Sequence, residues 1–431
     1  MRQYCDVIAA RSALGTGALQ IENPTIGGTP FEARSESPDL RRVIRLCCAV
    51  LLFLVAVIPA ISAAQTQQQT KPAGAEPTPE PAVPAILAAF DKYEVVAMPE
   101  AHGDKDLDDF ILSLIRTPAF SEKVNDIAVE CGNSLYQPVL DRYIAGEDVP
   151  FTEVRKVWRN TTQPMCGESG FFEQFFPLVR AINQKMPPGK RLRVLAGDPP
   201  IDWDQVKTFQ DYLKFTDRDV SVASVMEKEV LSKHRKALML FGVVHLMHGV
   251  GVPPPGNAVT IYEKVSPNVT FVINDLGDDF NLSASSISRF ATWPVPSLAW
   301  ARGTWLGALD FGHVFPVPFK LDQDCKVHYD FPQEKPMADL VDAFLYLGPQ
   351  HLKLVEPMPA DIALDGDYVS EWLRREALMG LSGPKTLKEF DQQIVNGAGS
   401  PLFPVVPDLS SITQSIIRGC LERNSHSSTP Q

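Results

Sequence analysis

Two histidines in this chain stand at the same kind of position, just past the end of a mostly apolar run. Residues 93–98 lead into His102, and residues 236–241 lead into His245. A β-strand that ends in a small or rigid residue, with a histidine three positions on, places the imidazole at the carboxyl edge of a sheet, where open α/β folds bind ligands. Because the arrangement occurs twice, it predicts a functional site at that edge.

Polar side chains follow each of the four runs that we predict to be strands. They are Glu100 and His102 after the first strand, Glu130 after the second, Asp198 after the third, and His245 with His248 after the fourth. The carboxyl ends of parallel strands meet at one edge of a sheet. We therefore expect these groups to converge, although they are far apart in the sequence.

Two imidazoles with one or two carboxylates are typical ligands of Zn²⁺, Mn²⁺ or Fe²⁺ in sites that keep open positions for water or substrate. On this basis we expect His102, Glu130 and His245 to hold a divalent metal, with Glu100 as the general base. The same groups would also work without metal, with one histidine as the base and an acidic partner that fixes its tautomer. The residue pattern does not choose between these two mechanisms.

Asp198 and His248 are expected to bind substrate at the same edge. Each has a structural alternative, since Asp198 precedes two prolines and could shape a turn, while His248 could be an ordinary loop residue. A lone histidine at a strand end is also often a hydrogen-bonded structural residue. The repetition and the intervening acids favour the functional interpretation.

Arg218 opens a predicted helix over 218–234. A positive charge at that end opposes the helix dipole, so a compensating acid or an anionic ligand is expected nearby. The alternative is an ion pair with Asp217 or Asp219.

Short apolar runs alternate with amphipathic segments through the middle of the chain. The predicted strands are 94–98, 126–131, 191–196, 236–244 and 269–273, with 337–347 as a final strand, and helices are expected over 104–115, 171–186 and 218–234. This order indicates βαβ units and an α/β fold with a central, mainly parallel sheet flanked by helices. We place the α/β domain at 85–350 and expect an irregular C-terminal extension, with peripheral helices and a frayed tail over 351–431.

The N-terminal segment has the pattern of an export signal. Three arginines within 41–45 precede the apolar run 46–61, and small residues follow at 62–64. We interpret 1–64 as an extension and signal peptide and 65–84 as a disordered, Pro- and Gln-rich linker. The protein is then exported, periplasmic or extracellular, with no transmembrane anchor after cleavage. An uncleaved anchor is the alternative, but the run falls short of the roughly 20 residues that a spanning helix needs.

Four cysteines lie beyond the signal, Cys131, Cys166, Cys325 and Cys420. An even number in an exported chain permits two disulfides, and their spacing matches no zinc motif.

The formal net charge of −12 makes nucleic acid an unexpected partner. The sequence also lacks a Gly-x-Ser-x-Gly elbow, a phosphate-binding glycine loop and a dinucleotide fingerprint.

The same residues give the chain a family resemblance. The segment 99–103, Glu130, Arg218 and the segment 242–245 resemble the motifs of the superfamily that joins erythromycin esterase-like enzymes, ChaN-like haem-binding proteins and Tiki/TraB metalloproteases. The resemblance covers about residues 95–248, and Pro99 stands where that family usually has glycine. It implies an α/β sandwich, but its members do different things, so fold kinship does not fix the activity.

Taken together, the leading hypothesis is an exported hydrolase of ester or peptide bonds, metal-dependent or based on His and Glu, which acts on a small-molecule or peptide substrate. In it, Glu100, His102, Glu130, Arg218 and His245 are the catalytic residues, with Arg218 on an anionic group. The alternative is a haem- or iron-binding protein for uptake, without turnover. A third hypothesis is a degenerate domain with a structural or partner-binding role.

Overall fold

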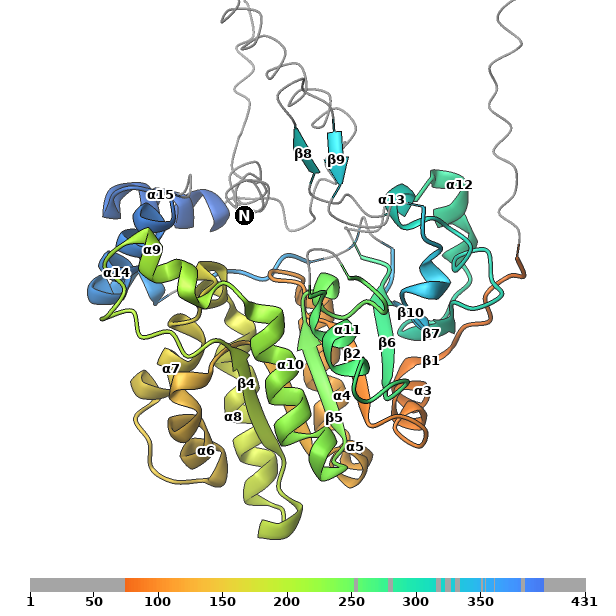
Figure 1. Ribbon diagram of the computed structural model, residues 1–431, viewed down its shortest axis with the longest axis horizontal. Helices are drawn as coiled ribbons and strands as arrows, with labels where there is room; N and C mark the ends of the chain where they lie inside the picture. The colour runs from red at the N-terminus through yellow and green to blue at the C-terminus, as the bar shows by residue number, and fades with distance from the viewer. Residues whose placement is uncertain are drawn as a thin grey trace, which may run out of the picture. The chain divides into compact units, whose positions relative to one another are not determined.

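The computed structural model describes residues 74–251, 255–277, 282–314, 319–321, 327–329, 334–349, 352, 354–359, 361–380 and 384–398 (Figure 1). The predicted signal peptide, the first part of the predicted linker, Cys325, Cys420 and the frayed tail lie outside these residues. Within the described part of the chain, no helix is both long and apolar enough to cross a lipid bilayer.

An eight-stranded sheet lies at the centre of the domain, in the order β1-β7-β10-β6-β2-β5-β3-β4. Its strands are β1 (Glu80–Pro81), β2 (Val95–Pro99), β3 (Asp126–Asn133), β4 (Arg193–Asp198), β5 (Ala237–Phe241), β6 (Thr270–Asp275), β7 (Ser297–Trp300) and β10 (Ala343–Tyr346). The strands from β10 to β4 run parallel to their neighbours, and β7 is antiparallel to both β10 and β1. The prediction of an α/β fold with a mainly parallel sheet is therefore confirmed. A separate hairpin pairs β8 (Phe319–Leu321) with β9 (Val327–Tyr329).

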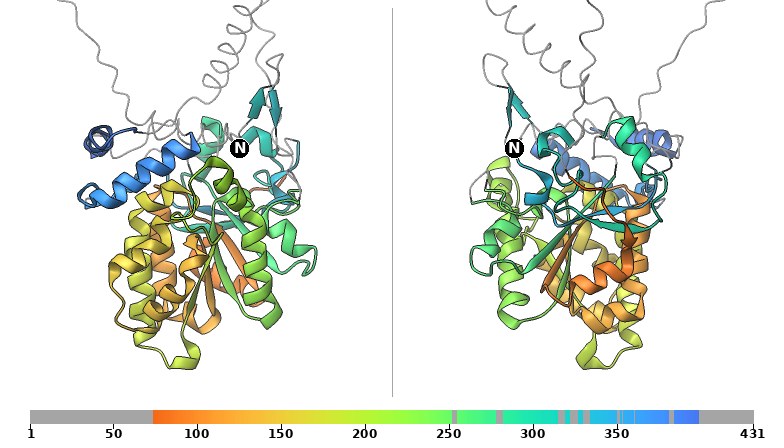
Figure 2. Two further views of the ribbon diagram at one scale, coloured as in Figure 1. Left: turned by 60° about the vertical axis from the view of Figure 1, so that its left-hand side comes forward. Right: turned by 90° about the vertical axis from the view of Figure 1, so that its right-hand side faces the viewer.

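Helices cover both faces of the sheet (Figure 2). They are α3 (Ala82–Ala89), α4 (Lys105–Arg116), α5 (Pro118–Lys123), α6 (Gln137–Ala145), α7 (Phe151–Arg159), α8 (Gly170–Gln184), α9 (Phe209–Tyr212), α10 (Arg218–Glu229), α11 (Ala258–Glu263), α12 (Ala284–Ile287), α13 (Phe311–Val314), α14 (Gly366–Met379) and α15 (Leu387–Ala398). Helices α3 to α8 pack on one face, and α10 and α11 pack on the other.

The two faces of the sheet receive alternate residues of each strand. Val96 and Met98 of β2 lie in the core beneath α3 to α8, whereas Val95 and Ala97 lie in the core beneath α10 and α11. Successive side chains of a strand point to opposite faces, so a strand covered on both sides must be apolar throughout. This explains why the central strands read as short continuous apolar runs, and why polar residues gather only where those runs end.

Strand β3 departs from regular pairing next to the predicted site. Val129 pairs with Ala196 and Asn133 pairs with Asp198, so β3 advances by four residues over the length in which β4 advances by two. Extra residues of this kind bend a strand and re-aim its side chains, and they are common beside active sites. Glu130 is the first residue of the irregular stretch.

Two expectations from the sequence need correction. The last part of the predicted disordered linker, residues 74–84, belongs to the folded domain: Ala75 hydrogen-bonds to the backbone of Gly303 and Trp305, β1 pairs with β7, and α3 begins at Ala82. Proline is tolerated at a sheet edge because no partner there needs its missing N–H. The predicted final strand is also shorter than expected, since a 3₁₀ turn occupies Met337–Asp339 and β10 begins only at Ala343.

Candidate active site

The ends of β2 and β5 bring the two predicted histidines to the same edge of the sheet. The two strands are parallel neighbours, with Pro99 opposite Phe241, and the N–H of Glu100 donates to the carbonyl of Phe241 at 3.1 Å. The segments that carry His102 and His245 therefore leave the sheet side by side. Strands β3 and β4 follow next to β5. We refer to Glu100, His102, Glu130, Asp198, Arg218, Asp219 and His245 as the rim cluster.

Arg218 lies at the centre of this cluster and bridges two buried acids. Its Nη2 donates to Glu130 Oε1 at 2.7 Å, and its Nε donates to Asp198 Oδ1 at 3.0 Å. The sequence predicted a compensating acid near this helix start, and the structure identifies Glu130 and Asp198. Burial alone would lower the pKa of Arg218, but these carboxylates raise it above that of an ordinary arginine. The guanidinium is therefore permanently charged.

Glu130 accepts hydrogen bonds on both carboxylate oxygens. Besides Arg218, the backbone N–H of Gly242 donates to Glu130 Oε2 at 2.5 Å. A Cβ at position 242 would lie 3.3 Å from that oxygen, so glycine allows the close approach. Burial alone would raise the pKa of Glu130, but Arg218 and the two imidazoles hold it well below the usual range of a glutamate. The side chain is a fixed anion and a poor proton acceptor.

Asp198 has its hydrogen-bonding capacity taken up by the protein. Thr162 donates to it twice at 2.6 Å, from its backbone N–H and from its hydroxyl, and Arg218 donates as well. The side chain has no exposed surface, and burial raises its pKa despite these donors. Asp198 thus orients Arg218, and the structure does not support the predicted role in contacting substrate, because a fully buried carboxylate cannot reach one.

Each of the two histidines has a carboxylate beside Nδ1, although only the contact of His245 has hydrogen-bond geometry. A carboxylate oxygen lies at Nδ1 in both, Glu100 Oε2 at 3.2 Å from His102 and Asp219 Oδ1 at 2.8 Å from His245. Asp219 Oδ1 also accepts from the N–H of Ala258 at 2.8 Å, which fixes its position. On the far side of the His245 ring, Nε2 lies 3.7 Å from Glu130 Oε1. A carboxylate at Nδ1 sets the ring orientation and leaves Nε2 for chemistry.

These neighbours shift both imidazoles toward the charged form. Burial alone would lower the pKa of His102, but Glu100 and then Glu130 raise it to about 9. In the same way, Asp219 and Glu130 outweigh burial and raise the pKa of His245. At neutral pH His102 is an imidazolium, which suits a proton donor or a stabiliser of negative charge.

Solvent reaches the cationic members of the cluster more than the central acids. The exposed fractions of the His102, His245 and Arg218 side chains are 23%, 16% and 13%, whereas Glu100, Glu130 and Asp198 are at 5% or below. Glu100 at 1% is too buried to be the predicted general base, and it acts as the partner that orients His102. Asp219 is also accessible, at 30%, so the opening presents the three cationic side chains together with one carboxylate. The cations can face an anionic group or a polarised carbonyl oxygen.

Further groups lie near His102, and the sequence pattern assigned none of them to the site. Cys131 follows Glu130 and forms a disulfide with Cys166, which confirms a structural bridge for this pair. Burial and then Glu376 raise the pKa of Glu168 to about 8, and His102 partly opposes the rise. Asp108 and Glu356 also face this region. Asp108 lies among the acidic residues of the first turn of α4, which suit the helix dipole and therefore give no separate sign of a site.

His248 belongs to a different part of the structure. Its Nδ1 lies 3.0 Å from Glu263 Oε2, and its Nε2 lies 3.0 Å from Asp342 Oδ2. Asp342 also accepts from the N–H of Val272 in β6. With both ring nitrogens occupied by carboxylates, His248 ties α11 to the sheet, and its predicted contact with substrate is not supported.

The arrangement of the cluster does not fit a divalent metal. Among the described residues, one group of at least three His, Cys, Asp or Glu ligand atoms lies within 4.8 Å of one another: His102, Cys131 and Cys166. The two sulfurs are joined in a disulfide, and the thiolate is the form that binds metal. The predicted set of His102, Glu130 and His245 does not form such a group, and the Arg218 guanidinium already neutralises Glu130.

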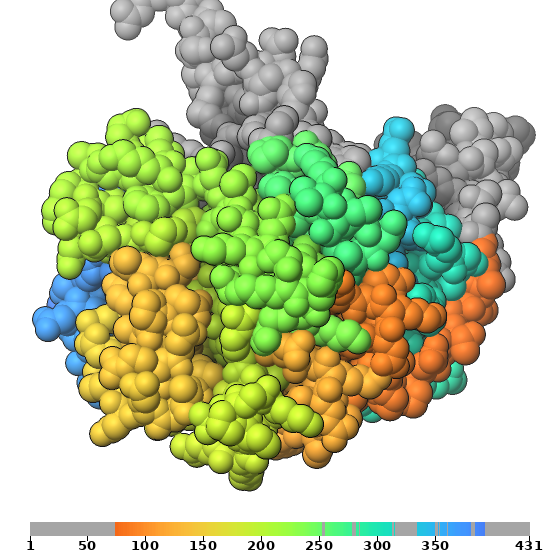
Figure 3. Space-filling view, turned by 60° about the horizontal axis from the view of Figure 1, so that its bottom comes forward, coloured from red at the N-terminus to blue at the C-terminus, as the bar shows by residue number. Residues whose placement is uncertain are grey.

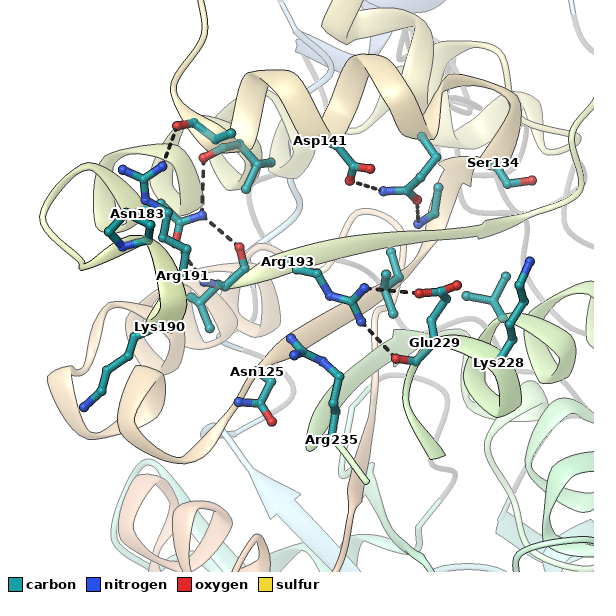
Figure 4. A pocket seen from close by; sticks show the side chains of 18 of the residues that line it. Asn125, Ser134, Asp141, Asn183, Lys190, Arg191, Arg193, Lys228, Glu229 and Arg235 are labelled. Atoms are coloured by element: carbon teal, nitrogen blue, oxygen red, sulfur yellow. Dashed lines mark hydrogen bonds and ion pairs between the residues drawn. The ribbon is translucent and has the colours of Figure 1, made fainter. Parts of the chain in front are cut away.

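A cavity of about 640 Å³ lies away from the rim cluster, between α6, the edge strand β4 and α10. Figure 3 shows this side of the molecule, where the strands begin, and Figure 4 shows the side chains that line the cavity. Two of its basic residues are paired with acids, since Arg193 and Arg235 both donate to the buried Asp126 and Arg193 also contacts Glu229. Lys190 and Lys228 also line the cavity, so its lining is partly basic.

Two side-chain amides cover the exposed edge of β4. Gln137 donates to the carbonyl of Val194 and accepts from the N–H of Ala196, both at 2.8 Å. Asn183 does the same with both backbone groups of Leu192, at 2.8 and 2.9 Å. Unpaired backbone at a sheet edge invites another strand, and these amides close it.

Comparison with known proteins gives little further guidance. No protein-family model matches this chain. No curated protein matches it. A crystal structure of a protein from Bacillus cereus is similar over 63% of this chain and 94% of that chain, with 10% identity and a TM-score of 0.41. The type III effector HopBA1 is similar over 48% of this chain and 88% of that chain, with 15% identity and a TM-score of 0.32.

A third similar structure is that of ChaN from Campylobacter jejuni, which shows cofacial haem binding. It covers 44% of this chain and 84% of that chain, with 15% identity and a TM-score of 0.29. At TM-scores this low, none of the three similarities carries an argument about this protein. The family resemblance noted in the sequence stays a prediction.

Proposed function

We propose that this protein is an exported hydrolase of ester or peptide bonds, whose reaction depends on two carboxylate–imidazole pairs and a fixed guanidinium. The observation that carries the proposal is the shared arrangement of His102 and His245. Each has a carboxylate at Nδ1, and both rings flank the Glu130–Arg218 pair. Paired acid and base groups at one opening are the minimum that hydrolysis by water requires.

The two imidazoles take different parts in this proposal. His102, held as an imidazolium by Glu100, donates a proton to the leaving group. His245, oriented by Asp219, removes a proton from the attacking water in the fraction of molecules in which it is neutral. Arg218 binds the carbonyl oxygen as negative charge develops on it, or an anionic group of the substrate.

Export rests on the basic and apolar segment at 41–64 and is supported by the Cys131–Cys166 disulfide. Disulfides persist in oxidising compartments and are rare in the cytosol. Pulse labelling of cells that express the full chain tests this part. A shortened chain in the periplasm or medium supports export, and a full-length chain retained in the cytosol contradicts it.

Hydrolysis is tested on the purified protein with p-nitrophenyl esters of increasing acyl length and with fluorogenic peptides. We expect His102→Asn and His245→Asn each to lower kcat/KM by about 100-fold or more. His234→Asn is the matched control, because His234 is 87% exposed and its left-handed backbone (φ 48°) suits asparagine. Full activity in both cluster variants, or no turnover of any substrate, contradicts the proposal. Loss of activity on chelation contradicts its metal-free form.

The haem-binding alternative is tested on the same preparations. His102 could supply an axial nitrogen, since its Nδ1 faces Glu100 and part of the ring is exposed. A Soret band that appears on titration with haemin and is lost in His102→Asn, without hydrolysis in any assay, would favour this alternative over the hydrolase.

A further inference from the structure

Asp108 is an acidic residue on the buried side of α4. Its side chain is 2% exposed, and neither of its carboxylate oxygens has a hydrogen-bond donor. Glu100, at 1% exposed, has no donor in hydrogen-bonding geometry on either oxygen, although His102 lies 3.2 Å away. Buried carboxylates without donors are costly, so their protonation state needs an explanation.

The groups around Asp108 are mostly acidic. Glu100 faces it from the end of β2, Glu356 from the segment 354–359, and Asp104 from the N-cap of α4. The segment of Glu356 is fixed by backbone bonds, in which the N–H of Glu356 donates to Gly103 and Lys105 donates to Leu354. Among the described residues, Asp108 forms no ion pair, and the one imidazolium described beside this set, His102, faces Glu100.

The donors available to Glu356 make it different from Asp108. The hydroxyl of Ser169 and the N–H of Gly170 both donate to Glu356 Oε2, at 3.2 and 3.0 Å. Asp108 receives no comparable bonds, although it lies in contact with Glu356. Two ionised carboxylates can only accept, so their contact becomes a hydrogen bond only when one of them carries a proton. The donors on Glu356 assign that proton to Asp108.

We propose that Asp108 is a carboxylic acid at neutral pH, that it donates a hydrogen bond to Glu356, and that it is a positioning residue for the Glu100–His102 pair. The neutral acid fills the space behind Glu100 without adding a second negative charge there. The part of this proposal that concerns catalysis rests on the proposed hydrolase function, whereas the protonation of Asp108 does not.

The electrostatics of the pair agree with this assignment. Burial, and after it Glu100 and Glu356, raise the pKa of Asp108 to about 10. Burial and Glu100 raise the pKa of Glu356 to about 7, a smaller rise because of its two donors. A bound cation would be the other way to offset the negative charges of these buried carboxylates. They do not, however, form a group of three ligand atoms within 4.8 Å among the described residues.

The pH dependence of thermal unfolding tests the proposal without any assay of activity. Asparagine has nearly the shape of protonated aspartate and keeps a donor, so Asp108→Asn should have about the Tm of the wild type at pH 5. At a pH above the pKa of Asp108 in the unfolded chain, the wild-type protein must take up a proton at Asp108 in order to fold. Its Tm therefore falls relative to that of the variant by about 1–2 °C for each pH unit up to pH 9.

The controls separate this result from other causes. Asp109→Asn, on the exposed side of the same helix, should show no pH-dependent difference. A Tm of Asp108→Asn that lies below the wild type by a constant amount at every pH would overturn the proposal, because it would mean that the native side chain is ionised. A rise in wild-type Tm on adding Ca²⁺, Mg²⁺ or Zn²⁺ at pH 8, absent in Asp108→Asn, would also overturn it in favour of a cation.

The positioning role has its own readout. Asp108→Asn should retain hydrolysis within about 3-fold, and the limb of the pH–rate profile due to His102 should keep its position. Asp108→Leu, which removes the donor, should shift that limb. An unshifted limb in Asp108→Leu overturns the positioning role, and the unfolding experiment still decides the protonation of Asp108 if hydrolysis is never detected.

Discussion

Arg218 Nη2 lies 2.7 Å from Glu130 Oε1, although 88 residues separate the two in the sequence. The contact joins the first turn of α10 to the irregular end of β3. It also places a permanent positive charge close enough to His102 and His245 to act on the pKa of both imidazoles. The predictions that follow concern this pair and the groups around it.

Replacing Arg218 with methionine should strongly destabilise the fold. Glu130 and Asp198 would be left buried without their cation, and breaking a buried pair in this way typically costs 3–5 kcal/mol, so we expect a loss of about that size. Equilibrium unfolding in guanidinium measures it. The control is Arg142→Met, because Arg142 and Glu147 are 57% and 56% exposed and such pairs are worth about 1 kcal/mol or less. Equal losses in the two variants would show that Arg218 has no special structural role.

The rate of hydrolysis should depend on pH through the two histidines. Because the pKa of His102 is raised to about 9, activity should fall as the pH rises through that value and the proton donor is lost. Activity should rise above the ordinary histidine range as His245, whose pKa is also raised, becomes neutral. Profiles of kcat/KM report the free enzyme. A descending limb that persists unchanged in the residual activity of His102→Asn would remove His102 as its origin.

His248 should make the stability of the fold depend on pH. Burial alone would lower its pKa, but Asp342 and Glu263 raise it to about 9, against about 6.5 in the unfolded chain. A raised pKa gives stability that is full below pH 6.5 and is lost as the pH rises through 9. Unfolding of the wild type and of His248→Gln at pH 6, 7.5 and 9.5 measures this. The difference between them should shrink with rising pH, and a constant difference would contradict the assignment.

Reduction of the Cys131–Cys166 bond should weaken both stability and activity. The bond closes a separation of 35 residues, for which chain entropy predicts about 4 kcal/mol. It also joins the residue after Glu130 to the 3₁₀ turn that carries Glu168 (Pro164–Glu168). Unfolding with and without a dithiol reductant measures the effect, and the double variant Cys131→Ala, Cys166→Ala is the control. If the reductant lowers the stability of that variant equally, another bond is responsible.

The strands that carry the site were predictable because a strand buried on both faces must be apolar. That rule located the ends of β2, β3, β4 and β5, and parallel topology then required the polar groups at those ends to converge. The roles of the individual residues within the rim cluster were harder to predict from the sequence. Burial decides that Glu100 orients His102 rather than contacting substrate, and burial depends on neighbours that the local sequence does not reveal.

The sequence by itself determined the fold class and the gathering of His102, Glu130 and His245 at one edge, because hydrophobic periodicity and chain order fix both. Only the tertiary structure decided that His248 belongs elsewhere, that Asp219 orients His245, and that Asp108 and Glu356 meet beside Glu100. Those relationships join segments up to about 250 residues apart. They follow from packing, for which a chain of amino acids carries no local signal.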